Sequence, residues 1–280
     1  MSKIKIVTDS TCDLSTKEAR KLNIHVIPLS ITIQGETYLD RIDITPETFM
    51  EKMKVSEELP KSSQPAVGEF LKLYDELGED GSEILSIHLT GKMSGTIESA
   101  RAASKMTASK VTIIDSSFIS KALGFQVREA AKMSEEGKSL EDILASIEKV
   151  RLGTKLYVVV DTLENLMKGG RIGKGKAMIG SLLNIKPIAL LEEGEYSPVA
   201  KVRSKAQAVK YVMKHFMEDI HGKALKSVCI CHADGLELAH LCKEKVEELT
   251  GFLDIEIDDT TPVISTHTGP GAIGFMYYTE

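Results

Sequence analysis

Short apolar runs alternate along this chain with stretches in which apolar residues recur at helical spacing. The runs have the length and β-branched content of buried strands, whereas the stretches between them begin with polar helix-start signals. Alternation of this kind predicts an α/β protein. The expected strands cover residues 4–8, 25–33, 84–89, 111–114, 156–160, 185–191, 228–231 and 254–257.

Three helix starts support this pattern. Ser15 with Glu18 forms a capping-box sequence, and Pro46 follows Thr45 at what would be the first helical position. Ser139 precedes a run with acidic residues in its first turn. We therefore expect helices to begin at these three places.

The pair Gln34-Gly35 lies between two alternating runs and has the composition of a hairpin turn. It predicts an antiparallel edge on an otherwise parallel sheet. The clearest strand–helix alternation ends near Asp161, and a glycine-rich basic stretch, residues 168–176, follows. We expect an N-terminal α/β domain over 1–160, with a mainly parallel sheet, and a C-terminal α/β domain over 161–280.

Composition narrows the class of protein. The chain has 280 residues, 42% of them hydrophobic and 27% charged, which is enough to bury a sizeable core. Its net charge of −6 does not favour a nucleic-acid surface or an anionic membrane patch. No apolar run approaches the length needed to span a bilayer, and the chain enters a strand pattern at Ile4, after Met1-Ser2-Lys3. We expect a cytoplasmic protein without stable membrane insertion.

The four cysteines are Cys12, Cys229, Cys231 and Cys242, and none forms a C-x-x-C pair. Cys229 and Cys231 alternate along an expected strand, so both sulfurs lie on one face. Small apolar packing is the favoured interpretation, and metal binding is the alternative.

The segment after Leu89 is the most informative part of the chain. A strand leads into the polar loop Thr90–Thr96, and a helical pattern follows at once. The first backbone N–H groups of a helix have no internal partner and carry the positive end of its dipole. With Ser94, Gly95 and Thr96 beside them, these groups predict a binding site for a carboxylate or phosphate.

Two glycine-rich segments resemble nucleotide motifs and lack the required context. Residues 170–176 have P-loop spacing, but Ala177 stands where a Ser or Thr should bind magnesium, and residues 163–168 before it read as a helix. Residues 269–274 match G-x-G-x-x-G, yet only six residues follow Gly274. The favoured role of these glycines is to allow tight turns or the close approach of a ligand or a neighbouring strand.

No hydrolase motif surrounds Ser94, because the residues around it fit neither G-x-S-x-G nor S-x-x-K. A Ser-His-Asp arrangement that uses Asp9 and His267 from distant segments stays open as an alternative. For Asp9 and Asp115, each at a strand end, capping of nearby backbone groups is the favoured role.

Five separated blocks, taken together and in order, resemble the DegV family of bacterial fatty-acid-binding proteins. The resemblance spans nearly the whole chain, and five blocks in the family's order are far more specific than any one of them. The blocks are 7–14, 60–65, 94–100, 168–172 and 267–271.

The resemblance implies a fatty acid whose tail occupies an apolar tunnel between two α/β domains and whose carboxylate lies near the surface. Ser62, where the family usually has threonine, and Ser94 would then contact the carboxylate. Ser63, Gly95, Thr96 and His267 are implied as further contacts near the head group. Arg171 and Arg203 match basic positions that attract the carboxylate or a partner protein.

The resemblance also implies that a separate ATP-dependent kinase phosphorylates the bound carboxylate to an acyl phosphate for phospholipid synthesis. The leading hypothesis is thus a carrier without catalytic residues, metal or cofactor. The alternative is an enzyme that uses the same cleft, either a hydrolase through Ser94 and His267 or a nucleotide-dependent phosphotransferase through residues 170–176. Preference for chain length would depend on side chains such as Met178, Ile179 and Leu182.

Overall fold

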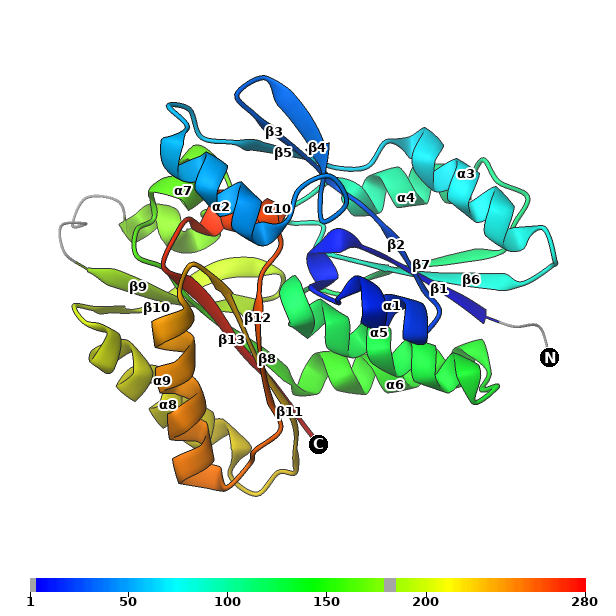
Figure 1. Cartoon of the computed structure of the whole chain (residues 1–280). Coiled ribbons are helices and arrows are strands. Elements are labelled where there is room, and N and C mark those ends of the chain that lie inside the picture. Colours follow the sequence, from blue (N-terminus) through cyan, green and yellow to red (C-terminus); the bar gives the residue numbers. More distant parts are fainter. Residues whose placement is uncertain (1–3, 179–184) are drawn as a thin grey trace.

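The computed structural model of the protein describes residues 4–178 and 185–280. Its first sheet has four parallel strands in the spatial order β2-β1-β6-β7 (Figure 1). Because all four strands run the same way, their carboxyl ends meet at one edge, where Asp9 pairs with Ile27 and His88 with Asp115. The expected α/β fold with a mainly parallel first sheet is confirmed. The strands are β1 (Ile4–Asp9), β2 (Ile24–Ile27), β6 (Glu83–His88) and β7 (Val111–Asp115).

Helices cover both faces of this sheet. On one face lie α3 (Val67–Gly78) and α4 (Thr96–Ser104). On the other lie α1 (Thr16–Lys21), α5 (Ser120–Glu135) and α6 (Leu140–Gly153). The side chains of Ser15 and Ser139 accept a hydrogen bond from the third residue of the helices they precede. The predicted starts of α1 and α6 are therefore confirmed.

The second sheet has six strands in the order β10-β9-β8-β13-β11-β12, and only β11 and β12 run parallel. Sequence analysis missed β10 and β13. Strand β10 lies at an edge and contains Pro198 beside a register shift, which is where a sheet tolerates proline. The strands are β8 (Thr154–Val159), β9 (Lys186–Glu192), β10 (Glu195–Val202), β11 (Leu225–Ala233), β12 (Ile255–Asp259) and β13 (Ala272–Thr279).

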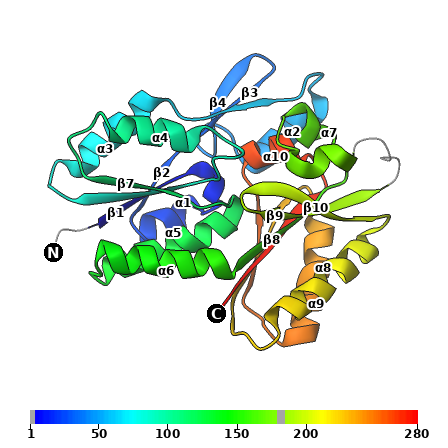
Figure 2. The ribbon, with the colours of Figure 1, turned by 180° about the vertical axis from the view of Figure 1, so that it is seen from behind.

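Layers of helix and sheet alternate through the molecule (Figures 1 and 2). The outer face of the six-stranded sheet packs against α8 (Lys205–Ile220) and α9 (Leu236–Thr250) around a core that includes Phe216 and Phe275. The opposite face shares one continuous apolar cluster with α5 and the parallel sheet. None of the described helices is long and apolar enough to cross a membrane.

A small third sheet lies at one end of both larger sheets, in the order β4-β3-β5 (Figure 1). The hairpin at Gln34-Gly35 is present, but it forms this separate sheet, so the expected antiparallel edge of the main sheet was wrong. Residues 25–33 likewise form two strands, because Pro28 and Leu29 intervene and redirect the chain. The strands are β3 (Ser30–Ile33), β4 (Glu36–Leu39) and β5 (Lys61–Ser63).

Three helices pack beside this small sheet: α2 (Pro46–Val55), α7 (Glu164–Lys168) and α10 (Pro262–Thr268). Thr45 caps α2 and Thr261 caps α10, and in each case proline follows at the first helical position. Two short 3₁₀ helices, η1 (Ser10–Cys12) and η2 (Gly173–Met178), complete the described elements. The P-loop-like residues therefore follow a helix and enter a 3₁₀ turn.

Strand β8 precedes the expected domain boundary at residue 160, yet it pairs with β9 and β13 of the six-stranded sheet. The chain thus enters the second sheet at Thr154, directly after α6. The division into domains at residue 160 stays a prediction.

Replacing Phe216 with Ala should lower the free energy of unfolding by about 3–5 kcal/mol, because the buried ring leaves a cavity. The ring packs edge-on against Phe275 and Tyr277, with centroids 5.5 and 4.9 Å away. Urea unfolding followed by circular dichroism measures the change. Leu253→Ala is the control, since Leu253 is 73% exposed and should change the stability little. Equal effects of the two substitutions would contradict this account of the core.

Candidate functional site

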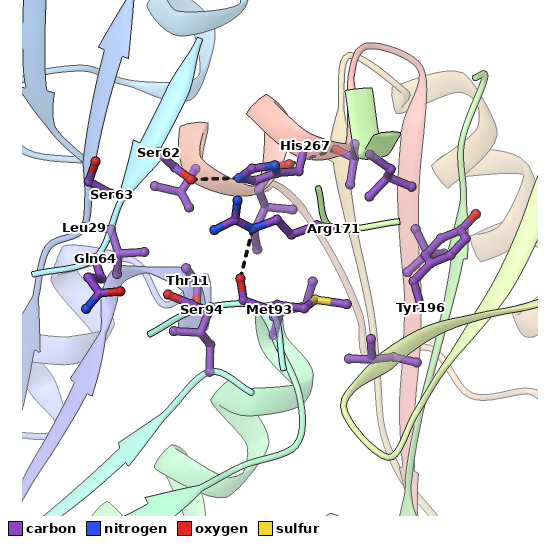
Figure 3. A pocket seen from close by; sticks show the side chains of 18 residues that line it. Thr11, Leu29, Ser62, Ser63, Gln64, Met93, Ser94, Arg171, Tyr196 and His267 are labelled. Atoms are coloured by element: carbon purple, nitrogen blue, oxygen red, sulfur yellow. Dashed lines mark hydrogen bonds between the residues drawn. The ribbon is translucent and has the colours of Figure 1, made fainter. Parts of the chain in front are cut away.

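A cavity of about 330 Å³ lies where the parallel, six-stranded and small sheets meet. One part of its lining is polar, and the remainder is aliphatic except for Met93 and Tyr196 (Figure 3). The carboxyl ends of β1 and β6 lead into its walls, as the open edge of a parallel sheet commonly does. The lining residues are Thr11, Leu29, Ser62, Ser63, Gln64, Leu89, Met93, Ser94, Ile119, Val158, Leu166, Arg171, Leu191, Tyr196, Val263, Ile264, His267 and Thr268.

Ser62 and His267 form the closest polar pair in this cavity. Ser62 lies on β5 and His267 on α10, and 2.7 Å separates Ser62 Oγ from His267 Nε2. With its proton on Nε2, the imidazole donates to Ser62, and the serine keeps its own proton for a ligand oxygen. The pair can therefore present a hydroxyl donor whose direction the histidine fixes.

His267 is neutral at physiological pH. Burial lowers its pKa to about 4, and the positive charge of Arg171 acts in the same direction. Its Nδ1 has no hydrogen-bond partner among the described residues. A Cβ on Gly169 would lie 2.3 Å from this nitrogen, so only glycine fits behind the ring. The imidazole is thus a weak base without a carboxylate to orient it, unlike the histidine of a hydrolase triad.

Arg171 is the only residue in the described lining of the cavity whose side chain is cationic. Its Nε donates to the carbonyl oxygen of Met93 at 3.0 Å, and its Nη1 to that of Gly169 at 2.7 Å. Figure 3 shows the guanidinium between the Ser62–His267 pair and Ser94. Neutral carbonyl partners leave its charge uncompensated. The guanidinium can therefore attract an anion to this end of the cavity.

Ser94 lines the cavity just before α4. Its Oγ lies 3.2 Å from the backbone nitrogen of Thr96 and 2.9 Å from Thr96 Oγ1. When Ser94 accepts both of these hydrogen bonds, its own proton is free for a ligand. Ser94 therefore faces the cavity and uses the Thr96 N–H itself, so the anion site expected after Leu89 stays a prediction that rests on the Ser94 hydroxyl.

Gly95 and Thr96 lie behind the cavity wall. A Cβ on Gly95 would lie 2.1 Å from Gln64 Oε1, so the glycine lets Gln64 pack against the start of α4. Thr96 is fully buried and holds Ser94. Both residues therefore support lining residues without belonging to the described lining.

Of the two remaining expected contacts, Ser63 lies at the cavity and Arg203 lies away from it. Ser63 lines the cavity and is exposed on β5. Arg203 is exposed between β10 and α8, away from the cavity lining, and its backbone nitrogen donates to Gln207. A head-group contact by Arg203 has no support from this geometry, and a role toward a partner stays a prediction.

Thr11 and Gln64 line the cavity although neither was chosen as a site residue. Both lie in polar segments next to expected strands, and this position is the sequence feature that could have identified them as lining residues. Gln64 Nε2 donates to Ser99 Oγ at 2.9 Å, and Thr11 Oγ1 donates to Asp9 Oδ1 at 2.6 Å. The pair therefore adds oriented polar groups to the same end of the cavity.

Asp9 and Asp115 hold the backbone where β1, β6 and β7 end. Asp9 accepts hydrogen bonds from the backbone nitrogens of Thr11 and Leu89, and Asp115 accepts from Gly91 and Ser117. Their predicted capping role is confirmed. The loop that carries Ser94 is thus fixed at its start by the first sheet.

Ile179 and Leu182, expected to shape the tail end, lie outside the described residues, as does the side chain of Met178. Strands β8 and β9 and helices α7 and α10 supply part of the described apolar lining, and Leu29, Leu89 and Ile119 add to it from the side of the parallel sheet. Leu166, Val158 and Leu191 are among its members.

Comparison with known proteins agrees with the family resemblance. A family model described as "Uncharacterised protein, DegV family" matches residues 3–280. A DegV domain-containing protein of Listeria innocua is 46% identical over 281 residues, and the match covers 100% of both chains. The chain belongs to the DegV family.

Two solved DegV structures share the fold over 100% of both chains. One is described as fatty acid binding of a DegV family protein from Thermus thermophilus, with a TM-score of 0.93 and 33% identity. The other is DegV, a fatty acid binding protein from Bacillus subtilis, with a TM-score of 0.89 and 34% identity. These relatives are binding proteins for fatty acids by their descriptions.

Replacing His267 with Gln should reduce the acid sensitivity of folding. The unfolded chain takes up a proton on this histidine near pH 6.5, while the folded protein does so only near pH 4. The stability that His267 contributes is therefore present at neutral pH and lost as the pH falls between these values, by at most about 3 kcal/mol. Urea unfolding near pH 7 and near pH 4.5 measures it for both proteins. The same pH dependence in both would contradict the assignment.

Proposed function

We propose that this DegV protein binds a long-chain fatty acid and presents its carboxylate to a separate ATP-dependent kinase. The supporting observation is the distribution of groups in one cavity. Hydroxyls of Ser62 and Ser94 and the guanidinium of Arg171 converge at one part, and aliphatic side chains line the rest. The described DegV relatives that bind fatty acids support the same ligand class.

The physical chemistry of a fatty acid suits this division of the cavity. Its carboxylate needs a few donors and one positive charge, which Ser62, Ser94, Arg171 and the neutral His267 provide together. Its tail gains about 0.8 kcal/mol for each methylene removed from water, so ten buried methylenes contribute about 8 kcal/mol. Most of the affinity then comes from the tail, and the head group sets the orientation.

Presentation to a kinase is the finer part of the proposal. A carboxylate held by Ser62 and Ser94 would lie beside Ser63, which is exposed on β5. The kinase would form an acyl phosphate for phospholipid synthesis while the insoluble tail stays buried. Arg203, exposed between β10 and α8, is available for contact with such a partner.

The two enzymatic alternatives have weaker support. Ser94 has Thr96 as its hydrogen-bond partner, whereas His267 pairs with Ser62, so the Ser94–His267 dyad of the hydrolase alternative is not formed. A phosphotransferase through residues 170–176 would need a strand that leads into the phosphate loop. Helix α7 stands in that place.

Organic extraction of the purified protein followed by mass spectrometry tests the ligand class. We expect a co-purified long-chain fatty acid, since a buried tail dissociates slowly into water. Protein stripped of lipid should bind added fatty acid and should give no heat of ATP binding in calorimetry. Absence of any acyl chain, together with failure to bind added fatty acid, would overturn the carrier function. Tight ATP binding would instead favour the phosphotransferase.

Replacing Ser94 with Ala should weaken fatty-acid binding and acyl phosphate formation with the kinase. Loss of one hydrogen bond to a charged group costs about 1.5–3 kcal/mol, which raises the dissociation constant about 10- to 150-fold. Equilibrium dialysis measures binding, and kinase-coupled ADP release measures turnover. Ser104→Ala is the matched control, because Ser104 lies at the far end of α4 and donates to Arg101. Unchanged binding and turnover in the Ser94 variant would refute this contact.

A further inference from the structure

Asp40 carries a buried carboxylate that is not among the residues lining the cavity. It directly follows β4 and is 1% exposed. Its Oδ2 accepts hydrogen bonds from Ser10 Oγ at 2.6 Å and from Thr261 Oγ1 at 2.5 Å. Its Oδ1 has no hydrogen-bond partner among the described residues. One oxygen of this carboxylate therefore joins two distant segments of the chain.

Each of these two segments forms a wall of the cavity. Ser10 opens η1, beside Thr11, and Ser10 Oγ accepts from the backbone nitrogen of Leu29 at 3.1 Å. The backbone nitrogen of Asp40 donates to the carbonyl oxygen of Leu29 at 2.9 Å. Asp40 thus fixes the Thr11–Leu29 wall from two sides.

The second segment is α10. Thr261 caps this helix, and its Oγ1 accepts from the backbone nitrogen of Val263 at 3.0 Å. The helix carries Val263, Ile264 and His267 into the cavity. A shift of Thr261 would therefore move the histidine that orients Ser62.

We propose that Asp40 is a positioning residue for the acyl-chain site: its ionised carboxylate holds η1 and α10 together, and uptake of a proton there lowers the affinity for an acyl chain. This inference rests on the proposed function, since it concerns the same cavity. Asp40 lies outside the described lining of the cavity and acts through Ser10 and Thr261.

Ionisation matters because hydrogen bonds to a charged oxygen are shorter and stronger than those to a neutral one. Burial raises the pKa of Asp40 to about 6, although the bonds from Ser10 and Thr261 and the charge of Arg41 act in the opposite direction. The carboxylate is then ionised at pH 8 and protonated at pH 5. The two bonds that position the cavity walls weaken over this range.

Few other charged groups face Asp40. Arg41, next in the chain, donates to Asp13 and to the carbonyl oxygen of Asp259. Asp13, which ends η1, raises the pKa of Asp40 further. Farther out, Asp259 Oδ1 lies 3.3 Å from His232 Nδ1. The positive charge of Arg41 is among the causes that lower the pKa of Glu47 of α2. His267, on α10, titrates near pH 4 and so below the range that Asp40 controls.

The contribution of Asp40 to stability and its effect on affinity should respond to pH in opposite directions. A carboxyl whose pKa is raised by folding stabilises the fold below its unfolded pKa, and this contribution is lost as the pH rises through about 6. Protonation of Asp40 therefore favours the folded state while it loosens the cavity walls. A purely structural role would make affinity follow stability.

The test uses hexadecan-1-ol, because its head group does not titrate. Equilibrium dialysis against cyclodextrin gives its dissociation constant in protein stripped of lipid, from about pH 5 to about pH 8. We expect binding to be about fivefold weaker at the acidic end, with a midpoint near pH 6. In Asp40→Asn this midpoint should vanish. Asp43→Asn is the matched control, since Asp43 is exposed, accepts from the backbone nitrogen of Leu39 and should keep the native profile.

A second variant keeps the inference testable if Asp40→Asn does not fold. Ser10→Ala removes a donor that lowers the pKa of Asp40, so the midpoint should move to higher pH. A flat native profile overturns the inference, and so does a midpoint that survives in Asp40→Asn or stays unmoved in Ser10→Ala. Failure of both hexadecanoic acid and the alcohol to bind at pH 8 would instead refute the proposed function.

Discussion

The carboxylate of Asp13 joins the parts of this molecule on which the cavity depends. It is 1% exposed and lies at the end of η1. One oxygen accepts from Ser120 at the start of α5 and from Thr260 at 2.8 Å, and the other accepts from the backbone nitrogen of Thr261 at 2.8 Å and from Arg41 at 3.3 Å. A buried carboxylate is costly unless its lone pairs are satisfied, and here four donors satisfy them. These donors come from α5, from the segment between β12 and α10, and from the turn after β4, so the charge ties together segments that lie beside all three sheets.

The position of the site follows from that junction. Ser62 and His267 are 205 residues apart in sequence, and their contact requires the small sheet and α10 to meet at one end of the larger sheets. Arg171 reaches across the same place to the carbonyl oxygen of Met93. The proposed carboxylate receptor thus draws its donors from three separate regions of the chain. None of these regions could form it alone.

Local signals in the sequence predicted those parts of the fold that depend on residues close together in the chain. Caps at Ser15, Thr45 and Ser139 predicted helix starts because a side chain there bonds to a backbone group three residues away. The same reasoning failed at residues 25–33, because the pattern of apolar positions does not reveal that the chain passes from one sheet to another. Two features of the site depend on segments far apart in the sequence: the pairing of His267 with Ser62, and the space that Gly95 leaves for Gln64. Local patterns reveal neither of them. Only the family resemblance placed Ser62 and His267 at the same site.

Helix α5 packs between the two large sheets, and its first eight residues, Ser120 to Val127, are all buried. Even Lys121 is 3% exposed, and it reaches β12, where it pairs with Glu256 and Asp258. The same apolar cluster includes Leu85 of β6, Val127 of α5 and Leu156 of β8. Neither sheet therefore has a complete core without this helix. Loss of either half would expose the other, so the chain should unfold as a single cooperative unit.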